Sequence, residues 1–539
     1  MLFRNIFCSC VIILCNLLTS FAQTDTPPRD WFLRDPETDH LQGLSVEKVY
    51  TTLLKNLPSR TVIVAVIDGG IDINHEDLKN IIWTNEKEIP GNGIDDDKNG
   101  YIDDVHGWNF IGGKNGNVNE DTYELTREYI RLGKLFDEVD GNKVPKKQKA
   151  DYEQYKKVKN KFEKLRDKNK KEYDLYRSMY GNISRSIDTL KSILKVDTLT
   201  RIQLDSFKTS DPNLAFAKGF ISSVLKRVSP ETSIEEIQQE LKENVDYFKV
   251  IVAYGYNPDF DSRLIIGDSY NNLSEKSYGN NDVKGPDATH GTHVAGIIGA
   301  DRKNEIGIKG IADNVRIMPV RAVPNGDERD KDIANAIRYA VDNGAKVINM
   351  SFGKSFSPEK NYVDDAVKYA EKKGVLLIHA AGNENEDNDK EKNFPTRYFL
   401  NGKEAKNWIE VGASAWGTDT HFVANFSNYG KKSVDVFAPG VDIYSTTPEN
   451  TYKNESGTSM ASPTVAGVAA LLLSYFPELT TAQVSDILKK SARTFDGLKV
   501  EKPGGGKASF SDLSNTGGLV NAYEAVKIAL EVRNKSMIR

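Results

Sequence analysis

Residues 62–70 read Val-Ile-Val-Ala-Val-Ile-Asp-Gly-Gly, an apolar, largely β-branched run that ends in a carboxylate and two glycines. Similar short runs begin at Val347 and Val375. Runs of this kind, without polar alternation, are typical of strands buried on both faces of a parallel sheet. Helical patterns lie between the runs, for example at residues 332–343 and 363–373, and each is followed by a glycine that can cap a helix. The alternation predicts an α/β fold with a mostly parallel sheet, and ligand-binding residues beyond the carboxyl ends of its strands.

Composition narrows the class of protein. The 539 residues are 39% hydrophobic and 28% charged, which excludes a membrane bundle and a disordered chain. Because 72 basic residues are balanced by 77 acidic ones, the net charge of -5 provides no positive field for nucleic acid. We therefore expect no nucleic-acid partner, and the composition does not indicate an oligomeric state.

The first 22 residues have the pattern of a secretory signal peptide. A short head with Arg4 precedes an apolar run and the small-x-small sequence Ser20-Phe21-Ala22. The alternative, a membrane anchor, needs roughly 18 or more apolar residues, and this run is shorter. All three cysteines lie within the segment, so cleavage leaves no cysteine nucleophile, cysteine-ligated zinc or disulfide. The sequence predicts export to the cell envelope or medium, with no membrane span after cleavage.

Residues 113–246 interrupt the alternation of strands and helices. This stretch has no strand-like runs, and its helical patterns include a capping box formed by Ser233 and Glu236. We expect a helical, lysine-rich insertion that divides the main domain into residues 23–112 and 247–539. Residues 143–177 carry 14 Lys or Arg against 6 Asp or Glu, a local net charge of +8. The basic face is either a docking surface for an anionic partner or envelope, or the solvated side of a helical hairpin.

Three blocks of sequence place chemically active side chains at the ends of regular elements. Asp68 closes the first apolar run, and a buried carboxylate there needs hydrogen-bond partners. His290 stands in His-Gly-Thr-His at the start of an apolar helical pattern. Ser459 stands in Gly-Thr-Ser-Met-Ala-Ser-Pro before a hydrophobic helical pattern. Taken singly, the serine could be an ordinary helix cap and the histidine a packed side chain.

Taken together, the three blocks resemble those of the subtilisin-like serine proteases, in that family's order of Asp, His and Ser. The resemblance covers roughly residues 31–110 and 282–529 and leaves the insertion outside. It implies the subtilisin-like three-layer fold and a catalytic triad of Asp68, His290 and Ser459. It also favours His290 over His293 as the base, and it places an oxyanion-hole amide at Asn383 in Ala-Ala-Gly-Asn.

These roles follow the chemistry that acyl transfer needs. A serine hydroxyl becomes nucleophilic when neutral histidine accepts its proton, and the aspartate holds the imidazole in the right tautomer. Activity should therefore fall as His290 protonates, near the unperturbed pKa of ~6.5. The resemblance further implies that two segments form the walls of the pocket for the side chain before the cleaved bond and pair with extended substrate: Ser351, Phe352, Gly353 and Ala380, Ala381, Gly382. Their uncharged character favours large apolar or varied side chains.

Two segments are candidate calcium loops. Residues 95–104 place oxygen ligands at alternate positions around a glycine, and the expected ligands are Asp95, Asp97, Asn99, the carbonyl of Tyr101, and Asp103 or Asp104. A solvated acidic turn is the alternative. By resemblance, Asn304 and Asp77 form a second site. Both would be structural, and catalysis would need no cofactor.

The sequence thus predicts an exported serine endopeptidase acting on proteins or peptides. The alternatives are a catalytically idle, calcium-stabilised binding or adhesion module, and an esterase or peptide ligase that uses the same triad. Only Gln23 to Ile67 separate the expected cleavage point from Asp68. We therefore expect no full inhibitory propeptide.

Overall fold

The computed structural model describes residues 27–226 and 232–537, so the predicted signal peptide, residues 1–22, lies outside the described residues. Contacts divide the described chain into two compact units. One contains residues 27–128 and 260–539, and we call it the sheet unit. The other contains residues 129–259, and we call it the helical unit.

A nine-stranded sheet forms the centre of the sheet unit, in the order β12-β15-β9-β8-β7-β6-β1-β5-β2. Neighbouring strands pair in parallel, apart from the antiparallel pair β12–β15. The strands are β1 Val62–Asp68, β2 Trp108–Asn109, β5 Val315–Arg321, β6 Val347–Met350, β7 Leu376–Ala380, β8 Trp408–Ser414, β9 Val436–Pro439, β12 Arg493–Thr494 and β15 Gly518–Leu519.

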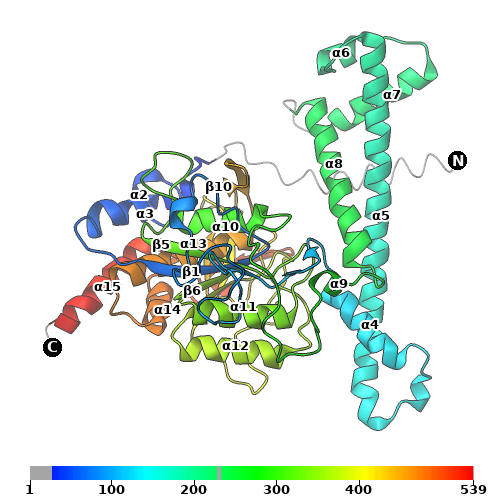
Figure 1. Ribbon diagram of the computed structural model, residues 1–539. Helices are drawn as coiled ribbons and strands as arrows, with labels where there is room; N and C mark the ends of the chain where they lie inside the picture. Colours follow the sequence, from blue (N-terminus) through cyan, green and yellow to red (C-terminus); the bar gives the residue numbers. More distant parts are fainter. Residues whose placement is uncertain (1–26, 227–231, 538–539) are drawn as a thin grey trace. The chain divides into compact units, whose positions relative to one another are not determined.

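Helices cover both faces of this sheet, which confirms the predicted three-layer α/β fold. Val62, Val64 and Val66 of β1 belong to one core with the first group of helices: α10 Thr289–Gly299, α13 Thr458–Tyr475, α14 Thr481–Lys490 and α15 Ala522–Met537. Ala65 and Ile67 point to the other face and belong to a second core with α11 Asp330–Asp342 and α12 Lys360–Lys372. Figure 1 shows α11 and α12 on the opposite side of β1 and β6 from α10. Alternate residues of one strand therefore serve two cores.

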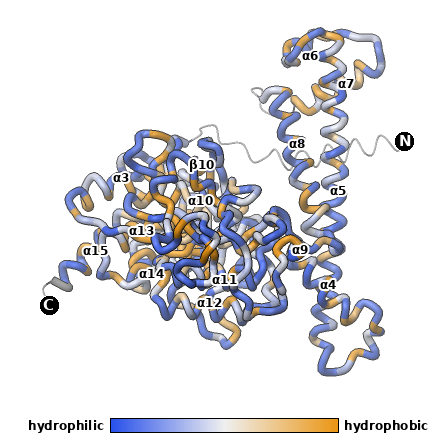
Figure 2. Tube along the Cα trace, viewed as in Figure 1, coloured by the Kyte–Doolittle hydropathy of each residue, from blue (hydrophilic) through white to orange (hydrophobic). Residues whose placement is uncertain are grey.

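Helix α13 runs through the first core and carries almost no polar surface. It is the one described helix with the length and hydropathy of a membrane span, and 94% of that span is buried inside the protein. Figure 2 shows hydrophobic residues gathered in the interior of the sheet unit around it. Such burial is typical of the core helix of a folded domain.

The remaining elements of the sheet unit are short. Three two-stranded sheets lie outside the main one: β3 Gly112–Gly113 with β4 Gly116–Asn117, β10 Ile443–Thr447 with β11 Thr451–Glu455, and β13 Lys499–Glu501 with β14 Lys507–Ser509. The short helices are α2 Pro36–Asp39, α3 Val46–Lys48 and α9 Arg263–Ile266.

The helical unit is built on α5, Lys149–Leu194, which contacts α7, Pro212–Leu225, and α8, Ile234–Val250. A short α6 covers Arg201–Ser206, and α4, Glu124–Phe136, begins in the sheet unit. The capping box predicted at the start of α8 is confirmed, because the Ser233 and Glu236 side chains each accept from the other residue's backbone N–H. The unit starts and ends later than the expected 113–246. Residues 112–117 form the β3–β4 hairpin instead, and helical structure continues to Gly255.

Candidate active site

Three neighbouring parallel strands deliver the predicted residues to one edge of the sheet. β1 lies beside β6, and β6 lies beside β7. In the register of the first pair, Ile67 faces Met350, so Asp68 and Ser351 leave the sheet side by side, about 4.8 Å apart in strand spacing. The wall segment that begins at Ala380 leaves the next strand at the same edge.

The Asp68 carboxylate contacts the His290 imidazole directly. Nδ1 of His290 lies 2.9 Å from Oδ1 and 3.0 Å from Oδ2 of Asp68. The backbone N–H of Gly69 also donates to Oδ1, at 2.7 Å. Asp68 is buried, whereas the His290 side chain is 40% exposed. One imidazole nitrogen is thus held by a buried acid, and the ring is partly exposed to solvent.

Gly291 allows the start of α10 to approach the end of β1 this closely. A Cβ at this position would lie 2.2 Å from the Gly70 carbonyl oxygen and 3.1 Å from Oδ1 of Asp68. Any larger residue would push the helix away from the strand. The glycine that follows His290 is therefore required by the approach of the two backbones.

The same contact raises the pKa of His290. Burial lowers the pKa, but the negative charge of Asp68 and its hydrogen bond outweigh burial and raise the value to about 9. Weaker contributions in the same direction come from Glu455 and Asp287. The expected value of ~6.5 is therefore too low for this geometry, because it described an imidazole without a charged partner.

The other histidines near the sheet have structural surroundings. His293 is buried, its Nε2 lies 3.1 Å from the Lys453 carbonyl oxygen, and burial lowers its pKa to about 4. His75 contacts the Thr451 carbonyl oxygen through Nε2. His379 is buried, and its Nδ1 lies 3.0 Å from Oε1 of Glu410. Each of these three rings is thus engaged away from Asp68, which favours His290 as the base.

Ser459 is the second residue of α13 and lies against the end of β6. Its Oγ donates to the Ser351 carbonyl oxygen at 3.2 Å, and the Ser351 hydroxyl donates to the Ser459 carbonyl oxygen at 2.9 Å. Because Ser351 leaves the sheet beside Asp68, this reciprocal pair places the Ser459 hydroxyl next to the strand that carries Asp68. A turn of the serine side chain would release its Oγ from Ser351.

The amide of Asn383 and the backbone N–H of Ser459 both lie near Gly457. Oδ1 of Asn383 accepts from the backbone N and from Oγ1 of Thr458, both at 2.9 Å, which fixes the amide plane. Its Nδ2 and the backbone N of Ser459 both lie 3.6 Å from the position that a Cβ on Gly457 would occupy. Two potential donors, one of them at a helix N-terminus, therefore lie near Gly457 beside the serine.

The two predicted pocket walls differ in their free hydrogen-bonding groups. The Ala381 N–H donates to Val411, and the Ala381 carbonyl accepts from the amides of Asn388, Asn393 and Asn428. This wall can line a pocket, but Ala381 has no free backbone group to pair with substrate, contrary to expectation. The peptide groups of Phe352 and Gly353, in contrast, have no backbone partner among the described residues.

A family model matches residues 59–512 of the chain, and its description is the subtilase family. The chain belongs to the subtilase family. Membership places it among the subtilisin-like serine peptidases, as the resemblance predicted.

Named relatives of this subtilase are proteases. The thermophilic serine proteinase of Bacillus sp. strain AK1 is 44% identical over 220 residues, which cover 40% of this chain and 49% of the relative, about half its length. Thermitase of Thermoactinomyces vulgaris is 37% identical over 273 residues, which cover 50% of this chain and 84% of thermitase. A solved protease structure from Pseudoalteromonas arctica PAMC 21717 is 29% identical and covers 48% of this chain and 81% of its own, with a TM-score of 0.38.

The acidic loop of this subtilase gathers three carboxylates. Glu88, Asp95 and Asp97 each offer one oxygen, and these oxygens lie within 4.8 Å of one another. Glu88 was not predicted, because it lies just before the alternating segment and outside its spacing pattern. Its Oε1 accepts from the backbone N–H groups of Asp96 and Asp97, which holds the loop around it. The donor set consists of hard oxygens and suits calcium.

The other predicted ligands of this loop make different contacts. Asp104 is buried and accepts from Tyr339, Asn85 and Asn99, and burial raises its pKa to about 6. Asp103 accepts from the backbone N–H groups of residues 92 and 93. Oδ1 of Asn99 accepts from the Tyr101 N–H. None of these side chains belongs to the cluster of three carboxylates.

The second predicted loop does bring its two residues together. Nδ2 of Asn304 donates to Oδ1 of Asp77 at 2.7 Å, and the backbone N–H of Ile308 donates to Oδ2 at 3.1 Å. Burial raises the pKa of Asp77. The side chain is thus engaged by the loop itself.

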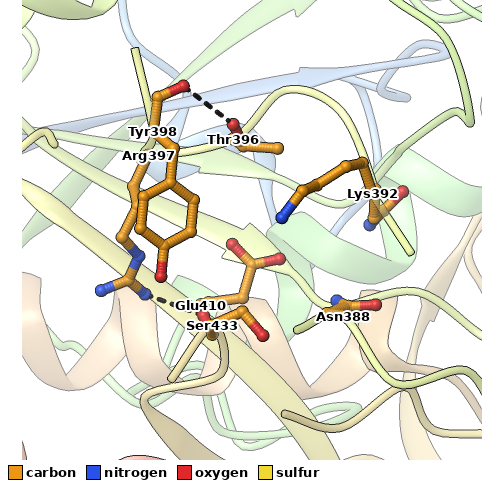
Figure 3. Close-up of a pocket in the computed structure, with 8 residues that line it drawn as sticks. Asn388, Lys392, Thr396, Arg397, Tyr398, Glu410 and Ser433 are labelled. Atoms are coloured by element: carbon orange, nitrogen blue, oxygen red, sulfur yellow. Dashed lines mark hydrogen bonds between the residues drawn. The ribbon is translucent and has the colours of Figure 1, made fainter. Parts of the chain in front are cut away.

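Figure 3 shows a small pocket beside β8 that is partly open to solvent. Glu410 points into it from β8, and Lys392, Arg397 and Tyr398 surround it. The remaining lining residues are Asn388, Asn393, Thr396 and Ser433. Two of them, Asn388 and Asn393, also brace the Ala381 carbonyl of the pocket wall. Sequence reasoning did not single out these asparagines, because an isolated Asn in a polar loop carries no pattern.

The His290 pKa can be measured without reference to catalysis. In an NMR titration, we expect the His290 ring protons to titrate near pH 9. Asp68→Asn should lower that midpoint by removing the negative charge, and Glu455→Gln should lower it less. His293, with a pKa of about 4, serves as an internal control that does not titrate between pH 6 and 10. An unchanged His290 midpoint in Asp68→Asn would show that the carboxylate is not the cause.

Proposed function

We propose that this subtilase is an exported serine endopeptidase that cleaves peptide bonds through an acyl-enzyme on Ser459. The observation that carries the proposal is the two-point contact of His290 with buried Asp68 at the sheet edge where Ser351 holds the Ser459 hydroxyl. Family membership and protease relatives support the same chemistry. A protein that only binds a partner does not require a histidine base oriented by a buried carboxylate.

In the proposed first step, Nε2 of His290 accepts the Ser459 proton while Oγ attacks the substrate carbonyl carbon. Asp68 keeps the proton on Nδ1 and stabilises the imidazolium that forms. His290 then donates the proton to the leaving amine, and water releases the acyl group by the reverse sequence. Because only neutral imidazole accepts a proton, its raised pKa makes the reaction favour alkaline conditions.

The attack places negative charge on the former carbonyl oxygen. We assign its stabilisation to Nδ2 of Asn383 and the Ser459 N–H, an assignment supported by the 3.6 Å distance of both nitrogens from the position of a Cβ on Gly457. Substrate would pair with the free peptide groups of Phe352 and Gly353, while Ala380, Ala381 and Gly382 line the opposite wall. Such preorganised donors act only as charge develops, so they lower the barrier rather than tighten substrate binding.

Export by the N-terminal segment remains part of the proposal. A relative from Bacillus subtilis strain 168, 35% identical over 241 residues that cover 44% of this chain and 25% of the relative, is named a cell wall-associated protease. The predicted signal peptide is consistent with a location in the cell envelope or medium. Proteins or peptides in that compartment are the proposed substrates.

We further propose that calcium binds the carboxylates of Glu88, Asp95 and Asp97 as a structural ion, with no role in the chemical step. Three carboxylates within 4.8 Å repel one another unless a cation screens them. Asp77 and Asn304 are proposed for a second, structural ion at the other loop.

A fluorophosphonate probe tests the nucleophile. We expect covalent labelling of Ser459 in the full chain, at a rate that rises with pH as His290 loses its proton. Ser459→Ala should abolish labelling, and Ser462→Ala is the matched control, since Ser462 is buried and its Oγ donates to Asn349. Mass spectrometry of the labelled peptide gives the position. Absence of label on a folded wild-type chain would contradict the serine mechanism.

Asn383→Ala tests the oxyanion donor. We expect kcat to fall by on the order of 100 to 1,000-fold, a magnitude measured in subtilisin, a member of this family. KM should change little, because the lost bond forms in the transition state. The exposed position of Asn383 predicts normal folding, which a thermal melt checks. A variant with wild-type kcat would remove this role from Asn383.

Calcium should raise the Tm of this subtilase, and a chelator should lower it. At a calcium concentration 100 times the Kd, the expected stabilisation is about 2.7 kcal/mol. Asp97→Asn should weaken the effect, whereas Asp96→Asn, whose carboxylate accepts from Ile89 and Asn92 instead, should leave it intact. Equal responses in both variants would place the ion elsewhere.

A further inference from the structure

One side of helix α5 carries a row of five lysines. They follow one another at intervals of four or three residues, the spacing that brings side chains to one side of a helix: Lys157, Lys161, Lys164, Lys168 and Lys171. At a rise of 1.5 Å per residue, this lysine row is about 21 Å long. We infer that the lysine row is a docking surface for the anionic head groups of a lipid membrane.

The lysine row is exposed, whereas another side of α5 is used for packing. All five lysines are exposed. Tyr155, Val158 and Phe162 are buried, and the Phe162 ring stacks on that of Tyr129, with ring centroids 4.2 Å apart. The apolar side of this part of α5 is therefore occupied within the helical unit, and the lysine row is available to a partner.

The chain does not neutralise the row by ion pairing. Four of its members form no ion pair with any residue in the described ranges 27–226 and 232–537: Lys157, Lys164, Lys168 and Lys171. Other cations of α5 do have partners, since Lys156 lies 2.7 Å from Glu153 and Arg166 lies 3.0 Å from Asp167. The row thus presents unpaired positive charge to solvent.

The helical unit as a whole is basic, whereas the rest of the chain is acidic. Residues 129–259 contain 26 Lys or Arg and 20 Asp or Glu, a net charge of +6. Because the whole chain has a net charge of -5, the remaining residues together carry -11. An anionic surface would attract the helical unit and repel the rest of the chain. Charge complementarity therefore assigns the contact to the helical unit, in which the row lies.

A membrane surface also matches the shape of the row. Helix α5 is a single element of 46 residues, and a flat surface can contact every lysine along one side of such a rod at the same time. Clusters of roughly four to eight Lys or Arg on a helix are typical of sites that bind anionic lipid head groups. The lysines make this contact through charge, so no apolar side chain needs to enter the hydrocarbon. The proposed export to the cell envelope would bring the chain to such a surface.

Co-sedimentation of the full chain with vesicles tests the inference. We expect vesicles of phosphatidylcholine and phosphatidylglycerol to bind at least about 100-fold more tightly than vesicles of phosphatidylcholine alone, since each lysine near an anionic surface contributes about fivefold. The preference should disappear when salt rises from about 0.1 to 1 M, because the screening length falls from about 10 to 3 Å. It should also disappear in a combined variant that keeps the helix but removes four charges of the row: Lys157→Gln, Lys164→Gln, Lys168→Gln and Lys171→Gln.

The matched control removes the same charge from exposed positions of the helical unit outside the row: Lys170→Gln, Lys195→Gln, Lys208→Gln and Lys226→Gln. This variant should keep most of the preference for anionic vesicles. Equal losses in the two variants would show that overall charge is the cause and would overturn the inference.

A wild-type chain without preference for anionic vesicles would also overturn it, and would show that the lysine row is only a solvated face. Binding to dextran sulfate without binding to vesicles would identify a soluble polyanion as the partner instead of a membrane. Peptide hydrolysis by all three proteins is measured in parallel. Its absence would contradict the proposed function, whereas the vesicle measurement tests the lysine row independently.

Discussion

The buried carboxylate of Asp68 constrains this protein more than any other group. It ends a strand in the middle of the sheet, where an unpaired charge would be costly. Three contacts satisfy it: the Gly69 N–H and the two approaches of His290 Nδ1, from 222 residues further along the chain. The same pairing aligns the imidazole and raises its pKa to about 9. The contact with His290 therefore both satisfies the buried carboxylate and orients the imidazole for the proposed reaction.

Parallel pairing explains why distant segments meet at that carboxylate. β1, β6 and β7 are neighbours, so their carboxyl ends open at one edge. Helix α13 packs across these strands in the first core and brings Ser459 against the end of β6. Because α13 is almost wholly buried, core packing holds its first turn in place. A nucleophile at that turn can be positioned without a dedicated loop.

The asparagines near the proposed active site hydrogen-bond mainly to groups of the protein itself. Oδ1 of Asn383 accepts from Thr458. The Ala381 carbonyl accepts from the side-chain amides of Asn388, Asn393 and Asn428. The wall that follows β7 is therefore held by side-chain hydrogen bonds. Neutral amides satisfy buried carbonyls without adding charge. The carbonyl of Ala381 is consequently held by three neutral amides.

A feature of the fold or the site could be predicted from the sequence where it depends on residues that are close together in the chain. The apolar run of β1, the helical patterns and the capping box of α8 depend on near neighbours in sequence, and the structure has them as predicted. The insertion was predicted at residues 113–246, whereas the compact helical unit covers residues 129–259, and a glycine-rich hairpin such as β3–β4 has no strand pattern that would mark the difference. Glu88 was missed because it lies outside the alternating spacing of the acidic loop, and Asn393 because nothing in the local sequence marks its contacts with Ala380 and Ala381.

The sequence by itself determined the α/β alternation, the family and the order of the acid, base and hydroxyl along the chain. Side-chain chemistry and hydrophobic periodicity can be read from the residues alone, so these features could be predicted without the tertiary structure. Only the tertiary structure decided the pKa of His290, the carboxylate cluster at Glu88 and the hydrogen bonds of Asn393 to the Ala380 and Ala381 carbonyls. Each of these depends on distances of a few ångströms between groups that periodicity does not relate, and the strengths of charge interactions, desolvation and packing are all set by such distances.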